Sequence, residues 1–202
     1  MPLWLVIGGN SSGKSAWAED FMVKTLGYRD VDYIATLDES YHALNDATLQ
    51  EKIKEHQMRR PSQWTVWNEP VNPINRILAL PTDHGVLWDG VGPYIVRNML
   101  DDPRHTPVNK RHASADDALW SSTNSLHTIM KDWEDLLVKI HCRSADTVIV
   151  SEETGLGILD INSFTQDFVR ALGKFNQVAS SCAKGVIMVV AGLPMWLKGA
   201  CP

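Results

Sequence analysis

The sequence Gly8-Gly9-Asn10-Ser11-Ser12-Gly13-Lys14-Ser15 matches the pattern G-x-x-x-x-G-K-[ST] of a phosphate-binding loop. The pattern has a physical basis, because glycines allow successive backbone N–H groups to turn towards phosphate oxygens. Lys14 would reach the β- and γ-phosphates of a nucleoside triphosphate, and Ser15 would ligate Mg²⁺. An apolar run, Leu3–Ile7, precedes the loop and a helical segment follows it. We therefore predict a phosphate site between a strand and a helix, the alternative being a Gly/Ser-rich turn with a solvated lysine.

Carboxylates follow two other runs that read as buried strands. Asp89 ends one run, and Glu152 and Glu153 follow the β-branched run Thr147–Ser151. In open parallel sheets the ligand crevice lies at the carboxyl ends of the strands, so Asp89 is in a position to meet Mg²⁺ directly or through water. Taken alone, Asp89 could equally cap a turn before Gly90.

His56 lies on a predicted helix that begins near residue 45 and stops before Pro61. Leu49, Ile53 and His56 follow one another at spacings of four and three, which places His56 on the apolar face of that helix. A lone histidine on an apolar face is usually structural, and from the residues alone that is the expected role of His56.

The elements that would position these residues alternate between strands and helices. The predicted strands are Leu3–Ile7, Val31–Thr36, Trp64–Trp67, Val86–Asp89, Thr147–Ser151 and the final buried strand Val186–Val190. The predicted helices, besides the one that carries His56, are Ala16–Leu26, a short helix within Pro70–Leu80, a long helix with apolar positions from Leu119 to Ile140, and a helix from Asn162 or Ser163 to Cys182. This alternation indicates a mostly parallel sheet covered on both faces.

The composition suits one globular domain that spans residues 1–202. The chain is 44% hydrophobic and 21% charged. Its net charge of -5 does not indicate nucleic-acid binding by bulk electrostatics. Three widely spaced cysteines without a C-x-x-C pair favour neither a disulfide scaffold nor a zinc site. No apolar run has the length of a membrane span, so we expect a cytoplasmic protein.

Residues 101–114 are predicted to form an exposed loop, because they hold two prolines and few apolar side chains. The loop also carries a basic cluster from Arg104 to His112. Such a cluster is more often solvated than functional, although it could contact a substrate phosphate.

Several separated motifs occur in one order along the chain. They are the phosphate loop, Tyr33-Ile34-Ala35-Thr36, the H-x-x-x-R-P pattern of His56, Arg60 and Pro61, Asp89 with Asn98, Glu153 with Gly155-Leu156-Gly157, Gly173 with Asn176-Gln177, and Gly192-Leu193-Pro194 with Leu197-Lys198. Together they resemble the adenosylcobinamide kinase/adenosylcobinamide-phosphate guanylyltransferase family, whose bifunctional enzymes assemble the cobalamin nucleotide loop. The resemblance covers most of the chain and is weakest between residues 101 and 146.

The resemblance implies a P-loop NTPase-like (RecA-like) three-layer α/β sandwich with a mostly parallel central sheet. It further implies that ATP or GTP phosphorylates adenosylcobinamide, and that GMP from GTP then passes to the new phosphate through a guanylylated His56. Neutral imidazole can attack the α-phosphorus near pH 7. Mg²⁺ near Ser15 and Asp89, together with Lys14 and Arg60, would neutralise the leaving pyrophosphate. The resemblance also implies a homo-oligomer, since members of the family typically form trimers.

The chain departs from the family pattern near the expected site. Ser11 stands where the family often has arginine, Glu152 where it often has asparagine, and Gln166 within a helix motif that usually contains arginine. These changes could weaken phosphate contacts, alter the nucleotide preference or remove one activity, and Arg170 or the basic loop could compensate. Glu153 is the candidate general base, although it could instead bind a ribose hydroxyl or a metal-bound water. The alternatives to the bifunctional enzyme are a P-loop kinase of another small metabolite and a GTP-binding module without catalysis.

Overall fold

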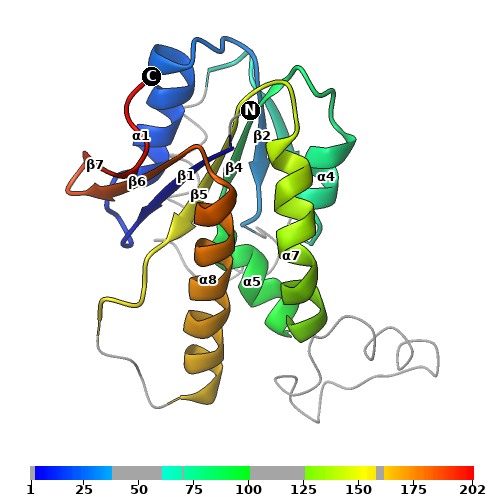
Figure 1. Cartoon of the computed structure of the whole chain (residues 1–202), viewed down its shortest axis with the longest axis vertical. Coiled ribbons are helices and arrows are strands. Elements are labelled where there is room, and N and C mark those ends of the chain that lie inside the picture. The colour runs from blue at the N-terminus through cyan, green and yellow to red at the C-terminus, as the bar shows by residue number, and fades with distance from the viewer. Residues whose placement is uncertain (1–2, 38–60, 70, 101–125, 158–161) are drawn as a thin grey trace.

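The computed structural model describes residues 3–37, 61–69, 71–100, 126–157 and 162–202 (Figure 1). His56, Arg60 and the predicted exposed loop at 101–114 lie outside these residues. Among the described residues, no helix is both long enough and apolar enough to cross a membrane.

The described residues form a seven-stranded sheet with the order β3-β2-β4-β5-β1-β6-β7. All neighbours pair in parallel except β6 and β7, which are antiparallel. The strands are β1 (Leu3–Gly8), β2 (Val31–Ala35), β3 (Thr65–Asn68), β4 (Gly85–Asp89), β5 (Thr147–Glu152), β6 (Gly185–Val190) and β7 (Leu193–Lys198). The helices are α1 (Lys14–Asp20), which continues as the π-helical turn η1 (Phe21–Thr25), α4 (Pro73–Ala79), α5 (Val91–Leu100), α7 (Leu126–His141) and α8 (Ser163–Cys182).

Helices cover both faces of the sheet. Alternate residues of β1 point to opposite faces: Leu3, Leu5 and Ile7 pack with α4, α5, α7 and α8, whereas Trp4 and Val6 pack with α1. Figure 1 shows α7 and α8 side by side along one face of the sheet. This arrangement confirms the predicted fold class, a three-layer α/β sandwich of the P-loop NTPase-like (RecA-like) type with a mostly parallel sheet.

Two elements were not predicted. The strand Val186–Val190 is present, but it is not the last strand, because the chain turns at Ala191 and Gly192 and returns as β7. Both turn residues have positive φ angles, as a tight two-residue hairpin requires. The helix α5 follows Gly90, whose φ of 105° lets the chain change direction directly after β4.

Arg143 follows α7 and is only 3% exposed. Its side chain contacts the segment that runs from α4 to β4. Its guanidinium donates hydrogen bonds of 2.6–3.2 Å to the backbone carbonyls of Ile77, Leu80, Pro81 and His84. These carbonyls belong to the segment from α4 to β4, so Arg143 fixes the route by which the chain enters β4. A buried donor that serves four carbonyls is expected to contribute strongly to stability.

We predict that Arg143→Met lowers the free energy of unfolding by about 3 kcal/mol, because methionine fills the space but leaves the carbonyls without donors. Urea unfolding followed by circular dichroism measures the change. Arg170→Ala is the control, since Arg170 is exposed and, within the described part of the chain, pairs with Asp167 on its own helix. Its expected cost is below about 0.5 kcal/mol. Equal stability of wild type and Arg143→Met would contradict the assignment.

Candidate functional site

The phosphate loop (Gly8–Ser15) connects the end of β1 to the start of α1. Gly13 adopts a φ of 88° directly before Lys14, the first residue of the helix, and Ser11 also has a positive φ. A Cβ at Gly8 would lie 2.6 Å from both the Ser12 Oγ and the Val189 carbonyl oxygen. Glycine is therefore required at position 8 for the loop to turn this closely against β6.

The hairpin between β6 and β7 packs against the phosphate loop. The Gly192 backbone N–H donates a 2.8 Å hydrogen bond to the Ser12 carbonyl. A Cβ on Gly13 would lie 3.2 Å from the Cα of Gly192, so the two glycines are in close contact. The Gly192-Leu193-Pro194 motif thus begins at a residue that helps to hold the phosphate loop.

Ser15 and Asp89 meet at the carboxyl edge of the sheet. The Ser15 Oγ donates a 3.0 Å hydrogen bond to Asp89 Oδ1, and the Tyr33 hydroxyl donates to the other carboxylate oxygen. Asp89 is the last residue of β4, as the sequence predicted. The two predicted metal ligands are therefore adjacent, and Tyr33 orients the carboxylate.

The donor set of Ser15 and Asp89 fits Mg²⁺, which prefers oxygen ligands and retains water and phosphate oxygens in its coordination shell. Among the described residues, no group of three or more His, Cys, Asp or Glu side chains could hold a metal alone. A Mg²⁺ ion held by these two side chains would leave coordination positions for triphosphate oxygens and water.

Thr36 ties the end of β2 to the turn that follows Asp89. Its hydroxyl lies 3.1 Å from the Asp89 carbonyl oxygen and also contacts the Gly90 carbonyl, while the Trp88 Nε1 donates to it at 3.4 Å. The motif Tyr33-Ile34-Ala35-Thr36 thus contacts Asp89 through its first and last residues. Sequence reasoning quoted this motif without a role, because side-chain contacts between separate strands are not visible in a single sequence.

Glu152, at the end of β5, is a functional candidate that sequence reasoning did not select. Its Oε2 accepts a 2.8 Å hydrogen bond from the backbone N–H of Gly92, at the start of α5. Burial is the largest influence on this carboxyl and raises its pKa above the ordinary value; Lys14 and the Gly92 N–H act against the rise, and Asp89 adds to it. Glu152 therefore belongs electrostatically to the phosphate-loop site.

Glu153 is differently placed. Its backbone N–H donates to the Gly8 carbonyl at 3.0 Å, and its Oε1 accepts a 2.7 Å hydrogen bond from the Gly155 N–H. The carboxylate thus stabilises the turn that follows β5. The Asn176 side chain of α8 supports the same region, since it donates to the Glu152 carbonyl at 3.0 Å and accepts from the Ser151 hydroxyl at 2.6 Å.

Lys14 lies over the phosphate loop, where its Nζ is 3.3 Å from the Gly9 carbonyl oxygen. The structure therefore brings together the residues Gly8–Ser15 and Asp89, with Glu153 at the adjoining strand end. The predicted positions His56 and Arg60 lie outside the described residues, and their proximity to the loop stays a prediction.

The amino-acid sequence is similar to those of known proteins over most of its length. The family model for "Cobinamide kinase / cobinamide phosphate guanyltransferase" matches residues 4–197. The bifunctional adenosylcobalamin biosynthesis protein CobP of Pseudomonas aeruginosa is 28% identical over 198 residues, which cover 96% of each chain. The corresponding CobU proteins of Salmonella typhimurium and Escherichia coli are 26% and 25% identical, and the alignments cover 96% of this chain and 98% of each relative.

Two solved structures are similar in outline. The KaiC-like protein PH0186 of Pyrococcus horikoshii is 12% identical with a TM-score of 0.39, and the alignment covers 93% of this chain and 70% of that protein. The flagellar accessory protein FlaH of Methanocaldococcus jannaschii is 12% identical with a TM-score of 0.44, covering 98% of this chain and 78% of that protein.

We predict that Gly8→Ala weakens binding of Mg²⁺-bound nucleoside triphosphate by tenfold or more, on the order of 1.4 kcal/mol. The added methyl group would collide with the Val189 carbonyl, which cannot move without displacing β6. Gly9→Ala is the matched comparison in the same loop, because a Cβ there meets no atom within 4 Å. Its loss of affinity is expected to be smaller. Isothermal titration calorimetry with a non-hydrolysable triphosphate measures both, and equal affinities for the two variants would contradict the steric argument.

Proposed function

This chain belongs to the cobinamide kinase/cobinamide phosphate guanyltransferase family, and on that premise we propose that it performs both reactions in that name. In the first, ATP or GTP phosphorylates the aminopropanol hydroxyl of adenosylcobinamide. In the second, GMP passes from GTP to the new phosphate and gives adenosylcobinamide-GDP and pyrophosphate. The protein is thus a transferase of cobalamin biosynthesis.

The observation that carries the proposal is the contact between Ser15 and Asp89 beneath the phosphate loop. It supplies, beside Lys14, the oxygen ligands that a Mg²⁺-bound triphosphate needs. Bound Mg²⁺ would neutralise charge on the phosphate oxygens. The loop N–H groups and Lys14 would hold the β- and γ-phosphates, so that the γ-phosphorus or the α-phosphorus can be attacked.

The second reaction needs a nucleophile for the α-phosphorus, and His56 takes this role in our proposal. Its imidazole nitrogen would displace pyrophosphate and form a phosphoramidate with GMP, which the phosphate of adenosylcobinamide phosphate would then cleave. Arg60, four residues further along the H-x-x-x-R-P pattern, would stabilise the leaving pyrophosphate together with Lys14. The support for these two roles is the family membership and the motif.

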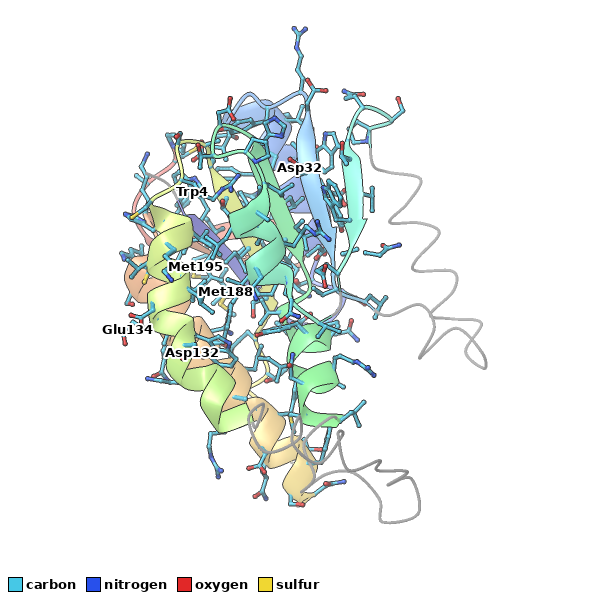
Figure 2. The ribbon with its side chains drawn as sticks, turned by 90° about the vertical axis from the view of Figure 1, so that its right-hand side faces the viewer. Trp4, Asp32, Asp132, Glu134, Met188 and Met195 are labelled. Atoms are coloured by element: carbon cyan, nitrogen blue, oxygen red, sulfur yellow. The ribbon has the colours of Figure 1, made fainter. Side chains whose placement is uncertain are left out.

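We predict that the protein becomes covalently labelled when it is incubated with Mg²⁺ and GTP labelled at the α-phosphate. The label should be acid-labile and should appear together with released pyrophosphate, because a histidine phosphoramidate hydrolyses in acid. His56→Ala should remain unlabelled. His84→Asn is the control. His84 pairs with Asp32 near the amino ends of β2 and β4, whereas the phosphate loop lies at the carboxyl ends of the strands. Asp32 is labelled in Figure 2.

Equal labelling of wild type and His56→Ala would show that the guanylyl-histidine mechanism is wrong. Phosphorylation of adenosylcobinamide without any label would favour the alternative of a kinase alone. Nucleotide binding with neither reaction would favour a GTP-binding module.

We also propose that the protein forms a homo-oligomer, as the family resemblance implies. The edge strand β7 supports this, because it is the last strand of the sheet and its outer edge has no partner among the described residues. Its side chains Leu193, Met195 and Leu197 are 71%, 54% and 53% exposed. An apolar edge strand is usually covered by another element or paired with another strand, and a second copy of the chain would do this for β7.

We predict that the double variant Met195→Glu/Leu197→Glu sediments as a smaller species than the wild type, because charges on β7 would oppose apolar contact between copies. Val138→Glu is the control, since Val138 is an exposed apolar residue on α7. Sedimentation velocity measures the mass of each. A wild type that is monomeric at micromolar concentration would contradict the proposal.

A further inference from the structure

Among the described residues, the carboxylates of Asp89, Glu152 and Glu153 lie at strand ends beside the phosphate loop, and the first and last of these have clear partners. Asp89 accepts hydrogen bonds from Ser15 and Tyr33, which suits it to the metal. Glu153 accepts from Gly155 within its own turn. Both carboxylates thus hold neighbouring groups of the site, and Glu152 is the third carboxylate at these strand ends.

The alternation of side chains along β5 assigns Glu152 to the face of the sheet on which the phosphate loop and α1 lie, and at the strand end its carboxylate reaches the start of α5. The two preceding alternate residues of β5, Val148 and Val150, belong to the core cluster that packs against α1, whereas Ile149 belongs to the opposite cluster. Residue 152 continues the first series, because side chains alternate along a strand. The electrostatic influence of both Lys14 and Asp89 on Glu152 agrees with this direction.

The backbone holds the Glu152 carboxylate in place. The Gly92 N–H donates to Oε2 at 2.8 Å. A Cβ at Gly92 would lie only 2.6 Å from that same oxygen, so the carboxylate occupies the space that the glycine leaves open. Glu152 is therefore a fixed carboxylate, half-buried, between the metal-binding strand β4 and the phosphate loop.

We propose that Glu152 accepts the proton of the acceptor hydroxyl in the phosphorylation step; this inference rests on the proposed kinase activity. As the hydroxyl oxygen forms its bond to the γ-phosphorus, its O–H bond breaks and the proton passes to the Glu152 carboxylate. The bond between the γ-phosphorus and the bridging oxygen breaks, and the nucleoside diphosphate leaves with that electron pair. The proton is released to water after the products depart.

A partly buried carboxylate suits this role, because burial raises the pKa of Glu152 and makes it a stronger base than an exposed carboxylate. The guanylyl step makes no such demand, since a neutral imidazole needs no base to attack the α-phosphorus. The two reactions should therefore depend differently on Glu152, and this difference separates a base from a structural residue.

The first variant is Glu152→Gln. Its amide oxygen can still accept the Gly92 N–H hydrogen bond, but the side chain cannot take up a proton. We expect kcat for adenosylcobinamide phosphorylation to fall by about 10² or more, with little change in KM for the nucleotide. Labelling of His56 by GTP should continue at the wild-type rate.

The second variant is Gly92→Ala, which moves the carboxylate without changing it. Alanine is favourable in a helix, and the atom that its Cβ meets is the end of a flexible side chain. We expect kcat for phosphorylation to fall about tenfold to a hundredfold through misplacement of the base. In the Glu152→Gln background, Gly92→Ala should cause little further loss.

Glu134→Gln is the matched control, because Glu134 is an exposed carboxylate on the outer side of α7 (Figure 2). It should retain wild-type phosphorylation. Thermal unfolding of each variant confirms that the fold is intact.

The outcomes distinguish failure of the inference about Glu152 from failure of the proposed function. Loss of phosphorylation with retained labelling in Glu152→Gln supports the inference. Phosphorylation by Glu152→Gln within about threefold of wild type, or equal loss of both reactions, overturns it and leaves the proposed function standing. Loss in Glu153→Gln with an unimpaired Glu152→Gln also overturns it. A wild type that performs neither reaction overturns the proposed function, and the inference with it.

Discussion

The site depends on the position of β5 between β1 and β4. In the parallel register Gly8 lies opposite Glu152, and Asp89 lies opposite Val150. The phosphate loop, the strand-end carboxylate of β4 and the end of β5 therefore share one edge of the sheet, although about 140 residues of chain separate the first from the last. A shift of one residue in β5 would turn Glu152 to the α8 face and remove it from the loop.

The phosphate loop is shaped by its neighbours as well as by its own glycines. The loop turns closely against the Val189 carbonyl of β6, and Gly192 in the following hairpin bonds to Ser12. The hairpin is possible because Ala191 and Gly192 both adopt positive φ angles. The family motif near the end of the chain therefore has a structural explanation, namely that it supports a loop near the beginning.

Much of the architecture could be predicted from the sequence, because long buried strands and strand-end carboxylates leave local signals. The pairing of Ser15 with Asp89 follows from the rule that parallel strands place their carboxyl ends at one edge. The strand β7 could not be predicted, since Pro194 within a short run argues against a strand unless that strand lies at an edge, which depends on the whole sheet.

For a related reason, the sequence does not show whether Glu152 or Glu153 faces the α1 side of the sheet. Strands in a parallel sheet are buried on both faces, so the run Thr147–Ser151 is apolar or small throughout and does not indicate which residues face α1. Only the packing of Val148 and Val150 against the α1 side reveals the direction of residue 152. Similarly, nothing in a single sequence shows that Tyr33 of β2 reaches Asp89 on the neighbouring strand β4.

The two departures from the family pattern at the loop act in the same electrostatic direction. Ser11 is uncharged and exposed in the loop, where the family resemblance predicts an arginine, and Glu152 is a carboxylate where the resemblance predicts an asparagine. Among the described residues, Lys14 is the cation that acts on Glu152, while Asp89 is a second nearby carboxylate. A divalent cation bound with the triphosphate would offset this negative charge, because Ser15 and Asp89 offer it oxygen ligands beside Lys14.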